Sequence, residues 1–330
     1  MAYRERDRAA AIALALELMA TGRVRGVQPD HDPAELDAIL GPPTGQWAPP
    51  DTDLALIRYF GLLEVHCSRP SRQAPWRADF FSAQLWRMNK PLKWTVPGPE
   101  LRRHGYEVIR REEPKLRADY YEVAESGSSA VVFRDRDLPR RWGHIAKISA
   151  TNAAPVPTGT PDFNAVHRAV YAAIGRPRST WADWLTDQGG PNPGWLRTAE
   201  RTVYVVLREN ASRAAEGVAF HAWLLDQAAA GRAWPADELA YRRAEFAAGH
   251  RDLPGVPEPE TVAEQCLAAL PMDRDAAARL PSDWRKIAPA DVRASKMTRA
   301  LLRCARAAEP RSPATLAELT RWQPLLPHLC

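Results

Sequence analysis

The sequence has few cysteines, no long apolar run and no strong excess of charge of one sign. Its four cysteines, Cys67, Cys266, Cys304 and Cys330, are far apart in a chain of 330 residues. Such scattered cysteines indicate free thiols in a reducing compartment rather than a disulfide framework. No stretch approaches the roughly 18 apolar residues that a membrane-spanning helix needs. These features predict a cytoplasmic protein without a membrane partner.

The amino-terminal residues superficially resemble a signal peptide, with a charged start and an apolar centre. However, Glu17 interrupts the apolar run, the starting charges are of both signs, and no cleavage site of small residues follows. We therefore predict an amphipathic helix from about Arg4 to Ala20.

The net charge of +5 is a small excess of 45 basic over 40 acidic residues. The densest basic pairs are Arg110-Arg111, Arg140-Arg141 and Arg242-Arg243, and acidic residues lie near each. A dedicated nucleic-acid-binding protein usually gathers its cations into a stripe or tail, so mixed charge favours ordinary solvated faces. Accessory nucleic-acid binding stays open as an alternative function.

Proline and tryptophan are abundant, with 30 and 12 residues. Prolines at this density predict short elements joined by rigid turns, and tryptophans supply bulky anchors between them. The length favours two domains, and 45% hydrophobic residues are enough for two cores. A long uninterrupted coiled coil is disfavoured.

The clearest local signal is GVQPDHDPAELDAILGPP, from Gly26 to Pro43. Asp32 is a good N-cap, Pro33 suits the first helical position, and Glu35 completes a capping box. Gly41 and the prolines after it end the helix. These residues predict a short helix over Pro33–Leu40.

After this helix the pattern is typical of strands, and the helical period returns in the second half. We predict an α+β domain over residues 1–150, with a mainly antiparallel sheet of five to seven strands and two or three helices. Residues 151–161, TNAAPVPTGTP, have the composition of a linker. Residues 162–330 are predicted to form an all-α domain.

Metal, cofactor and nucleophile signals are weak, so we expect no cofactor, no metal and no catalytic residue. His66 and Cys67 are adjacent, but in a strand their side chains point to opposite faces. Ser126–Ser129 has the composition of a hairpin turn rather than of a nucleophile elbow. Gly189-Gly190 lacks the lysine and hydroxyl of a phosphate loop.

Carboxylates lie near aromatic residues in two places, Asp183, Asp187 and Glu200 in one half and Asp119 and Glu122 in the other. Such residues could assemble an aromatic-lined acidic pocket, which keeps an enzyme among the alternatives. The simpler interpretation is that the aromatic rings are core and the acids are solvated.

Arginine and aromatic residues alternate between Arg69 and Arg87, which is the composition of a protein interface. The candidate interface residues are Arg69, Arg72, Trp76, Arg77, Phe80, Trp86 and Arg87. The competing interpretation places these aromatic rings in the core. The leading hypothesis is therefore a non-catalytic protein that binds another protein, as an inhibitor or as part of a complex.

The unit Gly26–Pro43 and the following strand LIRYFGLLEV resemble the opening of small actinobacterial immunity partners of polymorphic toxins. The shared features are a glycine, a capped helix, an LGPP-like stop and an aromatic-Gly-apolar strand, over about an eighth of the chain. A similar opening begins the two-helix, three-strand fold of the outer-membrane assembly lipoproteins. The resemblance implies an α+β fold and an immunity-type role, and carries over no site residue.

Overall fold

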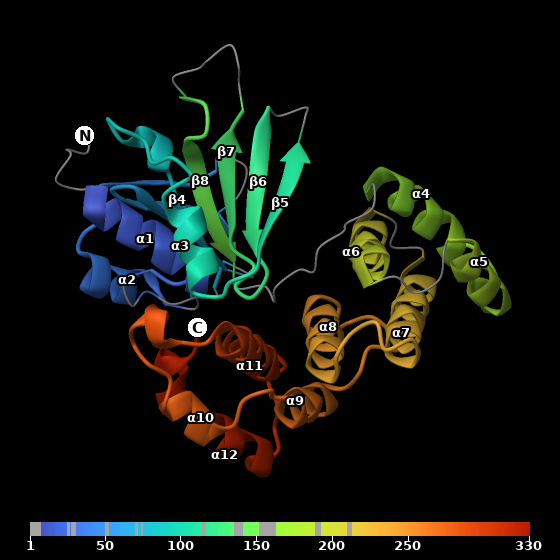
Figure 1. Ribbon diagram of the computed structural model, residues 1–330. Helices are drawn as coiled ribbons and strands as arrows, with labels where there is room; N and C mark the ends of the chain where they lie inside the picture. Colours follow the sequence, from blue (N-terminus) through green and yellow to red (C-terminus); the bar gives the residue numbers. More distant parts are fainter. Residues whose placement is uncertain are drawn as a thin grey trace. The chain divides into compact units, whose positions relative to one another are not determined.

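The computed structural model describes residues 8–24, 27, 31–49, 53–69, 72–73, 75–113, 117–134, 141–151, 163–188, 193–209 and 213–330. The amino-terminal half contains one antiparallel sheet with a few helices, and the carboxy-terminal half is helical (Figure 1). This architecture confirms the predicted order of an α+β part followed by an all-α part. The predicted linker lies outside the described residues, except for Thr151.

One sheet of eight strands forms the centre of the amino-terminal half. The strands are β1 (Gly45–Trp47), β2 (Ala55–Phe60), β3 (Leu63–Ser68), β4 (Arg77–Ala83), β5 (Val108–Glu113), β6 (Ala118–Val123), β7 (Ser129–Phe133) and β8 (Ile145–Thr151). Their order is β1-β2-β3-β4-β8-β7-β6-β5, and each neighbouring pair is antiparallel. The last strand in the chain thus lies between two earlier hairpin systems and joins them into a single sheet.

Helices α1 (Arg8–Thr21), α2 (Pro33–Leu40) and α3 (Pro97–Arg103) belong to the same half as the sheet. Alternate strand residues join the helices in one buried cluster, which includes Val65, Phe81 and Ile148 at no exposure. Because side chains alternate across a strand, the remaining residues point to the opposite face of the sheet. We call that opposite face the outer face.

The capped helix α2 has the predicted bounds and the predicted cap. Oδ1 of Asp32 accepts hydrogen bonds from the backbone N–H groups of Ala34 and Glu35, both at 2.9 Å. Oε2 of Glu35 accepts from the Asp32 N–H at 2.7 Å, which completes the capping box. Gly41 follows at φ +80°, a conformation that favours glycine, and ends the helix.

One predicted strand differs from the structure, and one strand was not predicted. The alternating pattern of Phe80–Met88 predicts a strand there, but strand β4 ends at Ala83, and Leu85–Arg87 form a short 3-10 helix, η2. In η2 the buried Leu85 turns toward the core, and Trp86 turns outward. The edge strand β1 was not predicted, because three residues are too few to show an alternating pattern.

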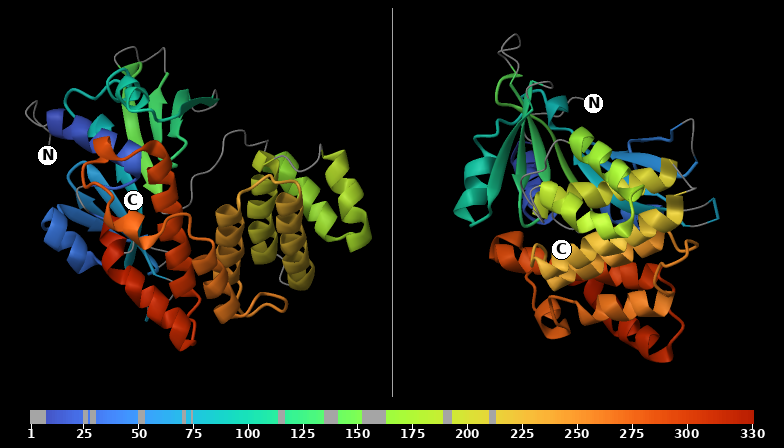
Figure 2. Two further views of the ribbon diagram at one scale, coloured as in Figure 1. Left: turned by 60° about the horizontal axis from the view of Figure 1, so that its bottom comes forward. Right: turned by 90° about the vertical axis from the view of Figure 1, so that its right-hand side faces the viewer.

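The carboxy-terminal half consists of helices of unequal length. They are α4 (Phe163–Ile174), α5 (Trp181–Asp187), α6 (Pro193–Glu209), α7 (Ala214–Ala230), α8 (Ala236–Gly249), α9 (Pro259–Ala268), α10 (Arg274–Ala278), α11 (Pro289–Ala307) and α12 (Pro313–Trp322). Short 3-10 helices occur at η5 (Arg178–Thr180), η7 (Trp284–Lys286) and η8 (Gln323–His328). Helices α6, α7 and α8 pack side by side (Figures 1 and 2). Across the described helices, none combines the length and apolar character needed to cross a bilayer.

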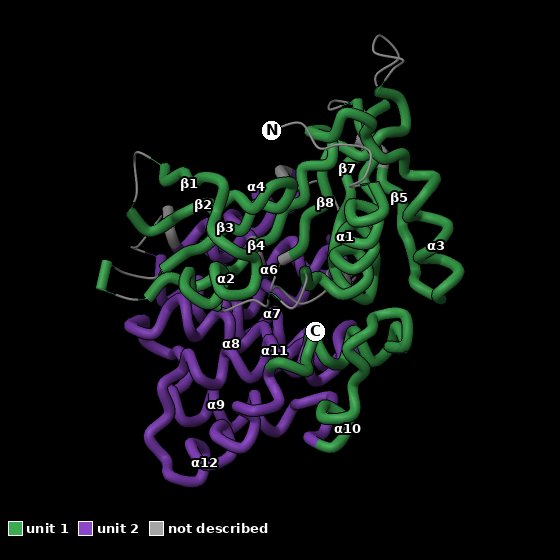
Figure 3. Tube along the Cα trace, turned by 90° about the vertical axis from the view of Figure 1, so that its left-hand side faces the viewer, with its two compact units in different colours: residues 1–156, 275–296, 327–330 green, residues 157–274, 297–326 purple. Residues whose placement is uncertain are grey.

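The chain divides into two compact units whose boundaries differ from the expected division at residues 151–161. Unit 1 comprises Met1–Val156, Asp275–Lys296 and Pro327–Cys330, and unit 2 comprises Pro157–Arg274 and Met297–Leu326 (Figure 3). The reason is packing: Trp284, Ile287 and Val292 belong to the buried cluster of unit 1. The Trp284 ring lies edge-on to the ring of His104, with 5.1 Å between their centroids.

Candidate interaction surface

A row of mostly apolar side chains crosses the outer face of the sheet. The strand register pairs Trp47 with Ile57, Ile57 with His66, and His66 with Phe80, so four neighbouring strands contribute one residue each. Trp47 is 47% exposed, and the other three side chains are half-buried. The rings of His66 and Phe80 meet edge to face at 4.8 Å. A partner could therefore contact a continuous apolar stripe at this place.

A polar cluster adjoins the row and is organised by Glu64, which is buried. Oε1 of Glu64 accepts a hydrogen bond from Nη2 of Arg87 at 2.8 Å, and Oε2 accepts from Nε2 of Gln84 at 2.7 Å. Gln84 in turn accepts from the indole N–H of Trp86 at 2.9 Å. These bonds fix Trp86 and Arg87, which lie in η2 rather than in the sheet.

The Arg87 guanidinium lies between two aromatic rings, 5.8 Å from the Tyr59 centroid and 5.6 Å from the Trp86 centroid. Both distances are within reach of cation–π attraction. Trp86 remains 50% exposed although its indole N–H is bonded. An oriented, half-exposed tryptophan beside an arginine has the properties of an interface anchor. We call Trp47, Ile57, Tyr59, His66, Phe80, Trp86 and Arg87 the outer sheet surface.

The other residues of the predicted interface lie at one end of this surface, where some of them act as internal anchors. Arg69 stacks on Trp76 at 4.4 Å and donates to the carbonyl oxygens of Asp53 and Arg72. Trp76 is half-buried and packs against the core cluster of unit 1. Arg72 and Arg77 are exposed. Of these four predicted interface residues, Arg69 and Trp76 thus stabilise the fold, and Arg72 and Arg77 face solvent.

His66 and Cys67 point to opposite faces of β3, as predicted. Cys67 belongs to the core cluster, where burial raises the pKa of its thiol to about 12. Burial lowers the pKa of His66, against an opposing effect of Glu64 and Asp79. Among the described residues, no group of three or more His, Cys, Asp or Glu side chains is arranged to hold a metal ion.

The Ser126–Ser129 segment forms the turn between β6 and β7 and has a structural role. The hydroxyls of Ser126 and Ser128 donate to the carbonyl oxygens of Met19 and Leu18 at 2.5 and 2.8 Å. Those carbonyls belong to the last turn of α1, where the Leu18 carbonyl also accepts from the Gly22 N–H at 2.9 Å. Lys296 donates to the Ser126 carbonyl. Both serines are fully buried, so neither is placed to attack a substrate.

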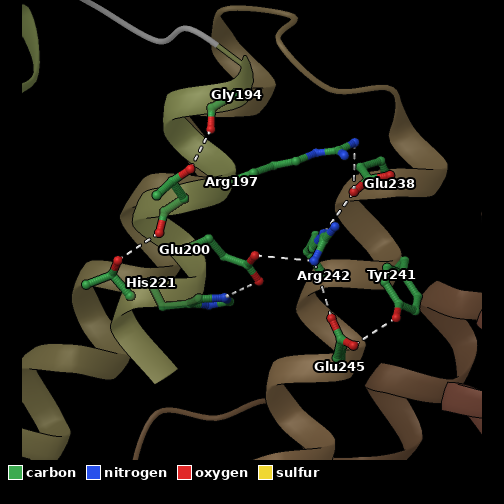
Figure 4. A network of polar contacts seen from close by, with 10 residues as sticks. Gly194, Arg197, Glu200, His221, Glu238, Tyr241, Arg242 and Glu245 are labelled. Atoms are coloured by element: carbon green, nitrogen blue, oxygen red, sulfur yellow. Dashed lines mark hydrogen bonds and ion pairs between the residues drawn. The ribbon is translucent and has the colours of Figure 1, made fainter. Parts of the chain in front are cut away.

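Unit 2 contains a buried cluster of charged groups, of which the sequence analysis named Glu200 and Arg242 without placing them together. Figure 4 shows Glu200 of α6, His221 of α7 and Arg242 of α8 converging. Nη1 of Arg242 lies 3.4 Å from Oε2 of Glu200, and Nε2 of His221 lies 3.5 Å from Oε1. Arg242 also bonds Glu238 at 2.8 Å, and Glu238 pairs with Arg197 at 3.3 Å.

This cluster has the residue types of a catalytic site, but a substrate could not reach its side chains. Glu200 is completely buried, and Glu238 and His221 are 1% and 3% exposed. Burial lowers the pKa of His221, whereas the neighbouring carboxylates outweigh burial and raise the pKa of Arg242. The other acids considered for this pocket, Asp183 and Asp187, lie exposed on α5. The cluster therefore holds three helices together, and these acids do not converge on a pocket.

A separate groove in unit 1, of about 360 Å³ and lined mostly by residues with apolar side chains, lies beside α1 and the β2–β3 turn. Its lining residues are Ala10, Ala11, Leu14, Val24, Leu40, Pro42, Thr44, Phe60, Gly61, Leu62 and Leu63. The Thr44 hydroxyl already donates to the Tyr59 carbonyl at 3.0 Å. Binding sites for small molecules usually add a few convergent polar groups to an apolar lining. The groove is therefore a weaker candidate than the outer sheet surface.

No family model matches the chain, and no curated protein or solved structure matches it either. The resemblance to immunity proteins at the amino terminus therefore stays a prediction. The geometry of the outer sheet surface is therefore the basis of the function proposed below.

Proposed function

We propose that this chain is a non-catalytic binding protein that recognises another protein through its outer sheet surface. The observation that carries the proposal is the network around Glu64. It orients Trp86 and Arg87 beside an apolar row formed by four strands. Interfaces place oriented aromatic and arginine anchors within apolar surroundings in the same manner.

Within this class, an immunity-type inhibitor of a toxin is the narrower proposal, and a subunit of a protein complex is the broader one. The narrower proposal is supported by the sequence resemblance around α2, whose cap and bounds fit the expected opening. A cytoplasmic location belongs to the same proposal, and the four free, buried cysteines support it.

The two alternative functions have less support. For nucleic-acid binding, the basic pairs would have to be available, but Arg110 and Arg111 pair with Asp119 and Glu122 at 3.0 and 2.9 Å. For an enzyme, Glu200 would have to reach a substrate, and it is completely buried. We therefore keep protein binding as the proposed function.

The proposal is tested by cross-linking and mass spectrometry of a partner captured from an extract of the source cells. We expect the cross-links to map to β1–β4 and η2. We expect Trp86→Ala to reduce capture about tenfold or more, as an interface anchor should. Glu64→Gln should reduce capture as well, because it releases Arg87 and Gln84 although Glu64 itself is buried.

Exposed Glu264 of α9 offers the matched control, and Glu264→Gln should leave capture unchanged. Unfolding curves would confirm that each variant is folded. Capture that is equal for the wild type, Trp86→Ala and Glu64→Gln would refute the proposed surface.

A further inference from the structure

Cationic side chains outnumber carboxylates on the outer sheet surface and its rim. The five cations are Arg69, Arg72, Arg77, Arg87 and Lys147, and the four carboxylates are Asp53, Glu64, Asp79 and, near Arg77, Asp32. The register places Lys147 and Arg77 on this face, because Ser149 pairs with Ser82 and Ser68 pairs with Arg77. The surface and its rim therefore carry a small excess of positive charge.

Three of the cations are well exposed. The Arg72 side chain is 76% exposed, with its Nε paired to Oδ2 of Asp53 at 2.6 Å, and Arg77 and Lys147 are exposed. By contrast, the Glu64 side chain is 10% exposed, and its two oxygens accept from Arg87 and Gln84. The Asp79 carboxylate accepts from the Ser68 hydroxyl at 2.6 Å. A partner that approaches this face thus meets three exposed cations, Arg72, Arg77 and Lys147, and one exposed carboxylate, that of Asp53.

We infer that the occupant of the outer sheet surface is an acidic protein segment in which Asp or Glu residues flank an apolar side chain. The inference rests on the proposed function and adds the chemistry of the partner. The apolar side chain would lie on the row that Ile57, His66 and Phe80 form. The acidic side chains would face Arg72, Arg77 and Lys147, since complementary charge steers association and selects partners.

The ring geometry favours a protein segment over a single-stranded nucleic acid. Bases bind by stacking flat on exposed aromatic rings. On this surface the His66 and Phe80 rings lie at 88° to each other and are half-buried, and Arg87 approaches the Trp86 ring. In addition, Arg87 is already bonded to a carboxylate that a phosphate chain would have to displace or tolerate.

The test is selection of phage-displayed random 12-residue peptides on the immobilised full-length chain. Peptides that also bind the Trp86→Ala, Phe80→Asp double variant are removed, so only ligands of this surface remain. We expect the enriched peptides to be acidic with a central apolar residue. A labelled peptide from the selection should bind about tenfold more weakly to the Arg72→Glu, Arg77→Glu, Lys147→Glu variant, and less tightly at high salt.

The matched control is Arg168→Glu, Arg176→Glu, Arg178→Glu, which changes the net charge equally at exposed positions of unit 2. We expect this control to bind the peptide as the wild type does, and a labelled oligothymidylate to bind none of the three proteins tightly. Enrichment of neutral or basic peptides would refute the acidic partner but leave the proposed function standing. Tighter binding of the oligonucleotide than of any peptide would refute both, as would the absence of any surface-dependent enrichment.

Discussion

Glu200, Glu238 and Arg242 bring full charges into the interior of a helical unit, where an unpaired charge would be very costly. Each has an opposite charge within 3.5 Å. His221 completes the group, with its ring stacked on that of Phe246 at 3.7 Å. A buried ionic cluster of this kind adds less stability than its ion pairs suggest, but removing one member is strongly destabilising. The cluster therefore makes unit 2 sensitive to protonation.

We predict that acid destabilises unit 2 through His221. Burial lowers the pKa of His221 in the folded chain, so the unfolded chain takes up a proton first as the pH falls below about 6.5. The stabilising contribution is complete above that pH and is lost as the pH falls toward the folded pKa. The loss is at most about 1.4 kcal/mol per pH unit. Urea unfolding between pH 7.5 and pH 5 measures it.

His221→Gln should flatten this pH dependence, whereas His328→Gln, at an exposed histidine, should preserve it. Equal slopes for the wild type and His221→Gln would contradict the prediction.

At the scale of the elements, α6 and α7 pack closely at Gly217. A Cβ atom at this position would lie 2.4 Å from Cδ2 and 3.1 Å from Cγ of Leu207, which is buried. The glycine thus provides room for a leucine of the neighbouring helix. An alanine would have to displace that leucine within a close-packed core.

We predict that Gly217→Ala destabilises the protein despite alanine's higher helix propensity. Overpacking costs about 1–3 kcal/mol, which exceeds the gain of about 1 kcal/mol from replacing a helical glycine. Gly249→Ala in α8 is the matched control, because no atom lies within 4 Å of its Cβ position. The control should be neutral or stabilising by up to about 1 kcal/mol. Equal melting temperatures for the two variants would show that Leu207 moves aside freely.

At the scale of the whole molecule, unit 1 is completed by segments that come after most of unit 2 in the chain. Trp284, Ile287, Val292 and Cys330 all belong to its buried cluster. The backbone N–H of Cys330 donates to the Ser295 hydroxyl at 2.6 Å, within the same unit. The fold of unit 1 therefore depends on nearly the full length of the chain.

We predict that a fragment ending at residue 161 does not fold as unit 1 does. It lacks the four apolar residues from the distal segments, and large cavities or exposed surface would remain in their place. The fragment should bind a hydrophobic dye and unfold without a cooperative transition, with the full chain as reference. A sharp transition of the fragment at the temperature of the full chain would contradict the prediction.

Local interactions made several features predictable from the sequence. The α2 helix, its capping box and its glycine end depend on residues within about ten positions of one another. The order of an α+β half and an all-α half was predictable because the spacing of apolar residues differs between strands and helices, and this spacing can be read within each segment. His66 and Cys67 were placed on opposite faces for the same reason. Arg69, Trp76 and Trp86 shared one composition signal, however, and that signal could not separate anchors from exposed residues.

Other features depend on contacts between segments that are distant in the sequence, and only the tertiary structure shows them. The insertion of β8 between β4 and β7 defines which strands form the outer face. Glu64 meets Arg87 across 23 positions, and Lys296 meets Ser126 across 170. No periodicity records such pairs, because they arise when separately formed elements pack and exclude water together. The sequence by itself thus determined the elements and their amphipathic faces, and packing determined the two units and the outer sheet surface.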